Sequence, residues 1–192
     1  MTTIPLQVAF LTGQSDPRTC ALSRIQSAFL DALPVPASAR VRSNFPYVPA
    51  SNRPAHTSLL RASWNNTRQY FGSRTNAFAE LHRPAVSRMI ARADHTVLLA
   101  GSCGLELLAN LHLSDAELER LHVFAYGAVA RTRPACETMA VCGSRDWIAR
   151  AWRQPTDVIV DSSHLTYLET PHVLALCSAF VGRVESALGA LA

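Results

Sequence analysis

Thr96-Val-Leu-Leu-Ala-Gly-Ser-Cys-Gly-Leu-Glu-Leu-Leu108 is the stretch of this sequence that says most about the fold. Its first five residues form an almost continuous apolar run, which is typical of a strand buried on both faces. The run ends at Gly101, and the leucines that follow Gly104 belong to a predicted helix. Gly101 to Gly104 therefore predicts a tight turn that joins a buried strand directly to a helix.

The same alternation of short apolar runs and helical patterns extends along the chain in both directions. Strands are predicted at residues 7–11, 39–45, 96–100, 123–126, 138–142 and 158–160. Helices are predicted at 20–33, 59–93, 105–111, 114–121 and 171–188, with a long loop at 46–63. The helical region 59–93 should consist of more than one piece, with Pro84 at a helix start. Apolar strands separated by helices indicate a parallel sheet that is covered on both faces. We therefore expect residues 1–192 to form one α/β domain, with a mostly parallel sheet of about six strands and helices on both faces.

The composition of the chain fits one folded domain. It has 192 residues, of which 48% are hydrophobic and 17% charged, and this balance excludes an intrinsically disordered protein. No apolar run approaches the roughly 20 residues that a membrane-spanning helix needs. Residues 1–11 lack the basic segment of a signal peptide, so we expect a cytoplasmic protein that does not insert into membranes.

The charged residues and the cysteines narrow the classes of partner. All 18 basic residues are arginines, scattered from Arg18 to Arg183, and the chain has a net charge of +4. A scattered charge does not predict nucleic-acid binding, for which basic residues cluster, but it suits an acidic protein partner or an anionic substrate. The five cysteines are odd in number and lack C-x-x-C spacing, which argues against a disulfide framework or a zinc site. We expect neither a metal nor a cofactor.

Polar residues gather in the loops that follow four predicted strands. These loops are Thr12-Gly-Gln-Ser-Asp16, Gly101-Ser-Cys-Gly104, Gly143-Ser-Arg-Asp146 and Asp161-Ser-Ser-His164. In open parallel sheets, ligands bind at the carboxyl ends of the strands. The four loops are therefore the candidate site.

Ser102 stands at the apex of the second loop, with the small residues Ala100 and Gly104 two places to either side. An abrupt strand-to-helix turn has room only for small residues at those positions, and it lifts the apex side chain clear of the sheet. The pattern is a G-x-S-x-G nucleophile elbow in which Ala100 replaces the first glycine. Cys103 is intrinsically the stronger nucleophile, but as the apex it would place Leu105 where a small residue is required. The same glycines also suit a turn that only packs strand against helix or binds a phosphate.

Two later strand-end loops carry the groups that would activate a serine. A serine nucleophile needs a base to accept its proton and a carboxylate to orient that base. Asp146 follows the predicted strand 138–142, and His164 follows the strand 158–160, which is the chain order of hydrolases with this architecture. Asp161 also ends a strand and remains an alternative to Asp146 as the orienting acid.

Three segments together resemble the α/β-hydrolase superfamily: the elbow at 100–104, Cys-Gly-Ser-Arg-Asp-Trp-Ile-Ala-Arg at 142–150, and Val-Asp-Ser-Ser-His-Leu-Thr-Tyr-Leu at 160–168. The resemblance spans nearly the whole chain. It implies a nucleophile at Ser102, a general base and acid at His164, and an orienting carboxylate at Asp146.

The resemblance also implies an oxyanion hole made of two backbone N–H groups. One belongs to the residue after the nucleophile, Cys103, and the other to the loop after the first core strand, where Gln14 is the candidate. This loop lacks the histidine that commonly opens it in the family, although only a backbone donor is needed there. An ordinary strand-to-helix loop, capped by Ser15 or Asp16, is the alternative interpretation.

The substrate class follows from what the resemblance implies about access to the serine. Only about a dozen residues separate the strand at 123–126 from the next one, and family members with a lid insert it there. The implied site has no lid domain and is open, or covered only by residues 46–75. Such a site suits small esters and also acyl groups on a carrier protein, whose acidic surface would attract Arg131, Arg133 and Arg145.

The sequence thus predicts a serine hydrolase, either an esterase or a thioesterase, that acts on a small-molecule or carrier-bound acyl substrate. A non-catalytic ligand-binding or interaction protein on the same scaffold is the alternative, because a fold does not determine a function.

Overall fold

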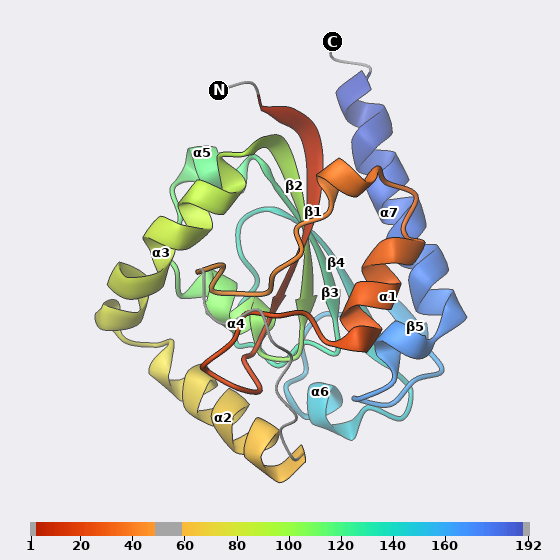
Figure 1. The fold of residues 1–192 in the computed structure, drawn as a ribbon. Helices are drawn as coiled ribbons and strands as arrows, with labels where there is room; N and C mark the ends of the chain where they lie inside the picture. Colours follow the sequence, from red (N-terminus) through yellow and green to blue (C-terminus); the bar gives the residue numbers. More distant parts are fainter. Residues whose placement is uncertain (1–2, 49–58, 190–192) are drawn as a thin grey trace.

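The computed structural model describes residues 3–48 and 59–189, and five strands of this part form one all-parallel sheet (Figure 1). The strands are β1 (Ile4–Thr12), β2 (Ala93–Gly101), β3 (Leu121–Tyr126), β4 (Glu137–Gly143) and β5 (Val158–Val160). They lie side by side in chain order, β1-β2-β3-β4-β5. The predicted α/β class is confirmed, and the described sheet has five strands instead of about six.

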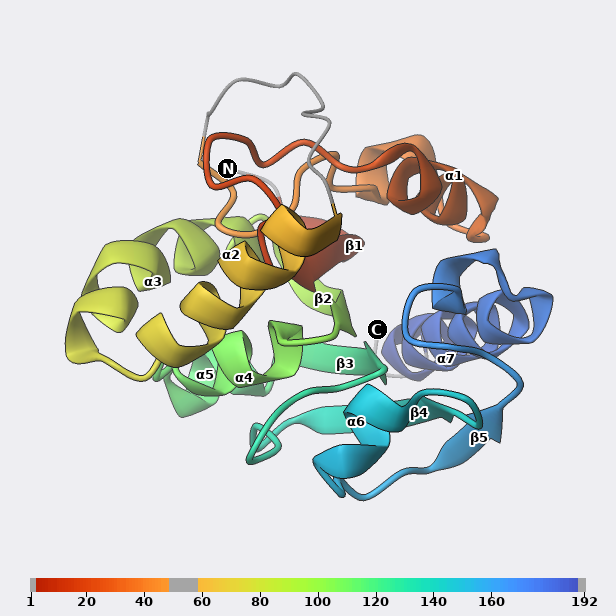
Figure 2. The same cartoon turned by 90° about the horizontal axis from the view of Figure 1, so that it is seen from below.

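Helices cover both faces of the sheet. They are α1 (Arg24–Ala32), α2 (Leu59–Gly72), α3 (Asn76–Ile90), α4 (Gly104–Ala109), α5 (Asp115–Leu118), α6 (Trp147–Ala151) and α7 (Pro171–Gly189), with 3-10 turns η1 (Ala37–Ala39) and η2 (Tyr167–Glu169). Helices α1 and α7 lie on one side of the sheet, and α3, α4 and α5 lie on the other (Figure 2). Helices α2 and α6 lie beyond the carboxyl ends of the strands (Figures 1 and 2).

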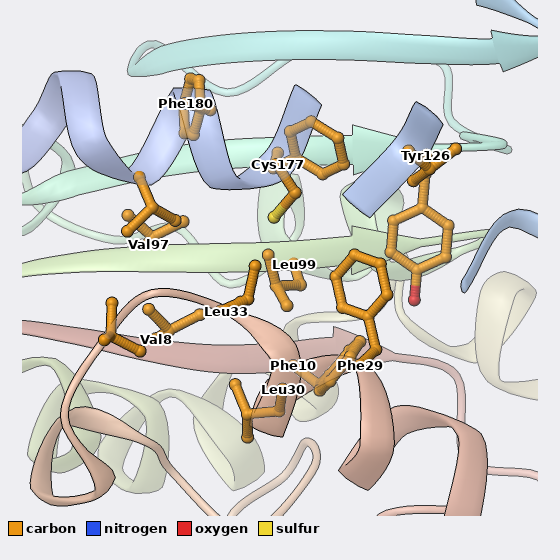
Figure 3. Close-up of a cluster of buried hydrophobic side chains, with 14 of the residues drawn as sticks. Val8, Phe10, Phe29, Leu30, Leu33, Val97, Leu99, Tyr126, Cys177 and Phe180 are labelled. Atoms are coloured by element: carbon orange, nitrogen blue, oxygen red, sulfur yellow. The ribbon is translucent and has the colours of Figure 1, made fainter. Parts of the chain in front are cut away.

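Alternate side chains of β1, β2 and β3 enter two apolar cores, one on each face of the sheet. On β1, Val8 and Phe10 point toward α1 and α7, whereas Ala9 and Leu11 point toward α3 and α4. Figure 3 shows the first core, where Phe29 of α1 and Phe180 of α7 meet the β1 side chains and their neighbours on β2 and β3. Where both faces are buried, the central strands are largely apolar, as the sequence pattern predicts, whereas Ile159 of the edge strand β5 is exposed.

The strand predicted at 39–45 is wrong. Arg40 forms a single parallel bridge with Val8 of β1, and Ser43 forms one antiparallel bridge with Ala21. The segment does not continue as a strand along β1, because its backbone pairs instead with the loop after β1, where the Asn44 N–H donates to the Cys20 carbonyl at 2.7 Å. The Asn44 side chain still binds the end of β1: it accepts from the Thr12 N–H at 3.0 Å and donates to the Thr12 hydroxyl at 2.9 Å. The bridge at Arg40 lies on the edge of β1 opposite β2, so the chain switches sides at the carboxyl ends of β1 and β2. Such a switch point is where ligands bind in open α/β sheets.

Two helix predictions also need correction. Pro84 lies inside α3, which begins at Asn76 with the Thr75 side chain as its N-cap. The helix continues through Pro84 because that residue is exposed, and water can satisfy the carbonyl that the missing N–H leaves free. The short helix α6 was not predicted, because five residues are too few for a periodic pattern. No helix within residues 3–48 and 59–189 has the length and apolar character to cross a bilayer.

Candidate functional site

The turn between β2 and α4 holds Ser102 in a conformation that few residues adopt. Ser102 has a φ of +52°, in the left-handed region, which costs a non-glycine residue roughly 1–3 kcal/mol. Its N–H donates to the Tyr126 carbonyl at 3.2 Å, and its own carbonyl accepts from the Val129 N–H at 2.9 Å. The end of β3 and the loop after it therefore fasten the turn and hold the Ser102 side chain at the carboxyl edge of the sheet.

The glycines on either side of Ser102 are required by close packing. A Cβ at Gly104 would lie 1.9 Å from the carbonyl oxygen of Leu11 in β1, and a Cβ at Gly101 would lie 2.5 Å from the ring of Tyr126. Neither position has room for a methyl group. The need for a small residue at 104, expected from the sequence, thus has a definite cause: α4 begins directly against the backbone of β1.

The structure brings Ser102, His164 and Asp146 together in one hydrogen-bonded row. The Ser102 Oγ lies 3.1 Å from His164 Nε2, and His164 Nδ1 lies 2.9 Å from Asp146 Oδ2. The three side chains come from the loops after β2, β5 and β4, respectively. Residues separated by as many as 62 positions therefore meet at one edge of the sheet.

Asp146 is fully buried, and hydrogen bonds keep its carboxylate ionised. Burial alone would raise the pKa of Asp146, but the Ala149 N–H, the Tyr167 hydroxyl and His164 all bind its oxygens and together lower the pKa below its usual value. The Ala149 N–H belongs to the first turn of α6, for which Asp146 is also the N-cap. The unpredicted helix α6 is thus part of what holds the carboxylate.

Tyr167 is a site residue that the sequence did not reveal. Its hydroxyl donates to Asp146 Oδ2 at 2.7 Å and accepts from the Gly143 N–H at 2.6 Å. Burial and the bond to Asp146 raise the pKa of Tyr167, so the hydroxyl remains a donor. These bonds join η2 to residues at and just after the end of β4, more than 20 positions earlier in the chain, and no local pattern encodes that contact.

The two alternatives left open by the sequence occupy different environments. The Asp161 side chain is 81% exposed and pairs with Arg145 at 2.9 Å, while Asp146 occupies the position beside the imidazole. The Cys103 thiol is buried, and burial raises its pKa to about 12, so it stays protonated. The described geometry therefore favours Asp146 and Ser102 over these alternatives.

The two candidate oxyanion donors are placed differently. Cys103 precedes the first turn of α4, where its N–H has no acceptor within the helix. The Gln14 N–H donates to Oε1 of Gln69 in α2 at 2.7 Å, and Gln69 Nε2 donates back to Gln14 Oε1 at 3.2 Å. Gln14 N–H is thus occupied by a side chain of α2 in this structure.

A cavity of about 680 Å³ opens over Ser102 and His164. Its walls come from the loop at 12–16, the segment that leads into α1, and the loop around η2. Ala21, Leu22, Ile25, Leu165 and Leu168 supply apolar lining, while Arg24, Asn44 and Asn66 supply polar groups. The cavity offers space beside Ser102 for an organic substrate with both apolar and polar parts.

The three arginines expected to attract an acidic partner each contact an acidic side chain. Arg131 binds the buried Glu106 at 2.8 Å, Arg145 binds Asp161, and Arg133 reaches Asp157 at 3.5 Å. Their charge is therefore partly neutralised within the molecule. Arg24, by contrast, lines the cavity and makes no ion pair with the described residues.

Among the described residues, no group of three or more histidine, cysteine, aspartate or glutamate side chains could hold a metal ion, and all five cysteines are free thiols. The polar groups that line the cavity belong to Ser102, His164 and the surrounding loops. No protein-family model matches this chain, and no curated protein matches it closely enough to establish a relative.

Proposed function

We propose that this protein is a serine hydrolase of the α/β-hydrolase type that cleaves an ester or thioester through an acyl-enzyme on Ser102. The observation that carries the proposal is the row of hydrogen bonds from Ser102 through His164 to the buried Asp146. The left-handed Ser102 at a strand-to-helix turn supports it, because this turn exposes a nucleophile at the edge of a sheet.

In the proposed mechanism, His164 Nε2 accepts the Ser102 proton while Oγ attacks the acyl carbonyl carbon. The tetrahedral intermediate collapses, and the leaving alkoxide or thiolate takes the proton from the imidazolium. A water molecule then attacks the acyl-enzyme, with His164 again accepting a proton, which returns to Ser102 when the acid departs. His164 Nε2 thus takes up one proton and releases one proton in each half of the cycle, and the enzyme returns to its starting state.

Asp146 and Tyr167 act through His164 in this proposal. The carboxylate accepts the Nδ1–H of the imidazole, which places the lone pair of Nε2 toward Ser102 and stabilises the imidazolium. The Tyr167 hydroxyl donates to the same carboxylate oxygen, and the Ala149 N–H donates to the other one. These two bonds limit rotation of the carboxylate away from the imidazole.

The proposed substrates are small esters, thioesters, and acyl groups on an acidic carrier protein. The connection between β3 and β4 is the short loop 127–136, which is too short to form a lid domain. Of the segment 46–75 that could cover the site, residues 49–58 lie outside the described part, and α2 places Asn66 on the cavity wall.

Labelling with a fluorophosphonate probe and hydrolysis of a nitrophenyl ester test the proposal. The wild-type protein should react with the probe and turn over the ester, and Ser102→Ala should do neither. Cys103→Ala is the matched control, because it removes the neighbouring nucleophile and should keep substantial activity. Absence of labelling and turnover in the wild type would favour the non-catalytic, ligand-binding alternative. Activity lost in Cys103→Ala and kept in Ser102→Ala would reverse the assignment.

A further inference from the structure

The amide side chains of α2 meet the loop after β1 along one helix face. Asn65 Nδ2 donates to the Ser15 carbonyl at 2.8 Å, and Gln69 forms its two bonds with Gln14. Asn65 and Gln69 are four residues apart, so they project from the same side of the helix. Asn66 lies between these two attachments.

The Gln14 N–H is bonded to α2. The acceptor of that N–H, Gln69, does not line the cavity, although Gln14 itself does. An oxyanion bound at Ser102 therefore needs another donor on this side, unless the pair between Gln14 and Gln69 opens.

Asn66 is placed to be that donor. Its side chain lines the same cavity as Ser102 and His164. A Cβ built on Gly13 would lie 2.6 Å from Asn66 Oδ1 and 2.7 Å from the Cys103 Sγ, so the Asn66 amide packs over Gly13, beside the residue that follows the nucleophile. Only the absence of a side chain at Gly13 permits this approach.

The orientation of the amide leaves its donors available. Asn66 Oδ1 is the buried end and has no hydrogen-bond partner. The Nδ2 end is consequently the one that the cavity can reach, and no described residue accepts a hydrogen bond from it. A buried amide oxygen without a partner is uncommon in a folded protein, and a catalytic role is one recognised reason for such a group.

We propose that Asn66 Nδ2 donates to the developing oxyanion, together with the Cys103 N–H, and that Gln14 N–H instead anchors α2. This inference rests on the proposed hydrolase function. The donor would come from a helix beyond the sheet and from a side chain, and the attachments at Ser15 and Gln14 on either side would hold it before substrate arrives. Donors fixed in advance at the site of charge development lower the barrier, because they need no reorganisation during the reaction.

Asn66→Ala is the direct test, with the exposed neighbour Thr67→Ala as the matched control on the same helix. Removing one oxyanion donor should lower kcat on a nitrophenyl ester by about 10²–10³-fold with little change in KM. Affinity for a trifluoromethyl ketone, which forms an oxyanion on the serine, should fall in parallel with kcat/KM. Thr67→Ala should keep both values, and thermal unfolding of both variants establishes that they fold. If Asn66→Ala does not fold, Asn66→Asp keeps the shape of the side chain but lacks the N–H donors, and it should show the same two losses.

Outcomes that overturn the inference differ from those that overturn the function. An Asn66→Ala protein with wild-type kcat and ketone affinity, beside an inactive Ser102→Ala protein, would remove Asn66 from the site and leave the hydrolase intact. A rise in kcat on Gln69→Ala would equally count against it, since freeing the Gln14 N–H would then supply the donor. Equal activity of Ser102→Ala and wild type would reject the proposed hydrolase itself.

Discussion

At the scale of single residues, burial separates groups that the sequence leaves equivalent. Ser102 and Cys103 are adjacent nucleophile candidates, yet Ser102 faces the cavity, whereas the Cys103 thiol is packed against Gly13. Asp146 and Asp161 both follow strands, yet one is fully buried and the other pairs with Arg145 at the surface. The environment of each side chain decides which of the two can serve the proposed chemistry.

Replacing Asp146 and Asp161 separately by asparagine tests this difference. Asp146→Asn should lower kcat by about 10³–10⁴-fold, because the amide no longer fixes the imidazole in the tautomer that can accept the Ser102 proton. Asp161→Asn should leave kcat nearly unchanged, since it removes only an exposed ion pair. Steady-state hydrolysis of a nitrophenyl ester measures both. A larger loss in Asp161→Asn would exchange the roles of the two residues.

Asp146→Asn should also differ from the wild type in the pH dependence of stability. The pKa of Asp146 is lower in the folded protein than in the unfolded chain, so its ionised form stabilises the fold above the unfolded value of about 4. That contribution is lost as the pH falls through the folded pKa. The free energy of unfolding of Asp146→Asn should therefore lie below that of the wild type at pH 7, and the gap should narrow below about pH 4. A gap that stays constant with pH would mean that ionisation of Asp146 does not stabilise the folded protein.

At the scale of elements, the site depends on how closely α4 approaches β1. The first residue of α4, Gly104, lies against the Leu11 carbonyl, and this contact sets the direction in which the chain leaves the turn at Ser102. The turn is also tied to β3 by the Ser102 N–H. The elbow is thus held by two strands besides its own, which is why its left-handed residue can persist.

Gly104→Ala should therefore destabilise the protein by about 2 kcal/mol or more and reduce probe labelling at Ser102, because the added methyl group would collide with backbone. Gly182→Ala is the matched control: it lies in the middle of α7, and its Cβ would meet nothing within 4 Å. That substitution should stabilise the protein by about 0.5–1 kcal/mol through lower backbone entropy in the unfolded chain. Chemical denaturation measures both changes, and equal effects would contradict the packing argument.

At the scale of the whole molecule, the fold brings the residues of the site together. The parallel strands place loops from distant parts of the chain at one edge, where the cavity opens. The 18 arginines are spread along the sequence and do not cluster in one basic segment. Several of them form ion pairs with acidic side chains. Arg24 is an unpaired cation in the described part at the cavity wall.

If the substrate is an acyl group on an acidic carrier, kcat/KM for that substrate should exceed the value for the matching simple ester. It should also fall by about an order of magnitude between low salt and about 0.5 M, because screening weakens charge steering. Arg24→Ala should reduce this preference. Arg183→Ala should not, because Arg183 pairs with Glu137 at the amino end of β4, away from the cavity. Equal rates on both substrates, independent of salt, would leave a small-molecule esterase.

Local sequence patterns were enough to predict most of the fold and the main candidate residues of the site. Buried parallel strands are apolar along their whole length and helices repeat every 3.6 residues, so five strands and the closing helix at 171–188 could be predicted. The elbow at Ser102 was recognisable because its small neighbours reflect steric demands within a few residues. Asp146 and His164 could be proposed because strand ends share one edge of a parallel sheet.

Tertiary contacts decided the rest. The segment at 39–45 has the composition of a strand, but after one bridge to β1 its backbone pairs with residues 20 and 21 of the loop after β1. Tyr167 binds the acid only because η2 folds beneath it, and Asn66 reaches the cavity only because α2 lies across the loop after β1. The direction of the Gln14 N–H depends on Gln69, 55 residues away. Such contacts join side chains that no periodic pattern relates, so their energies act only once the chain has folded.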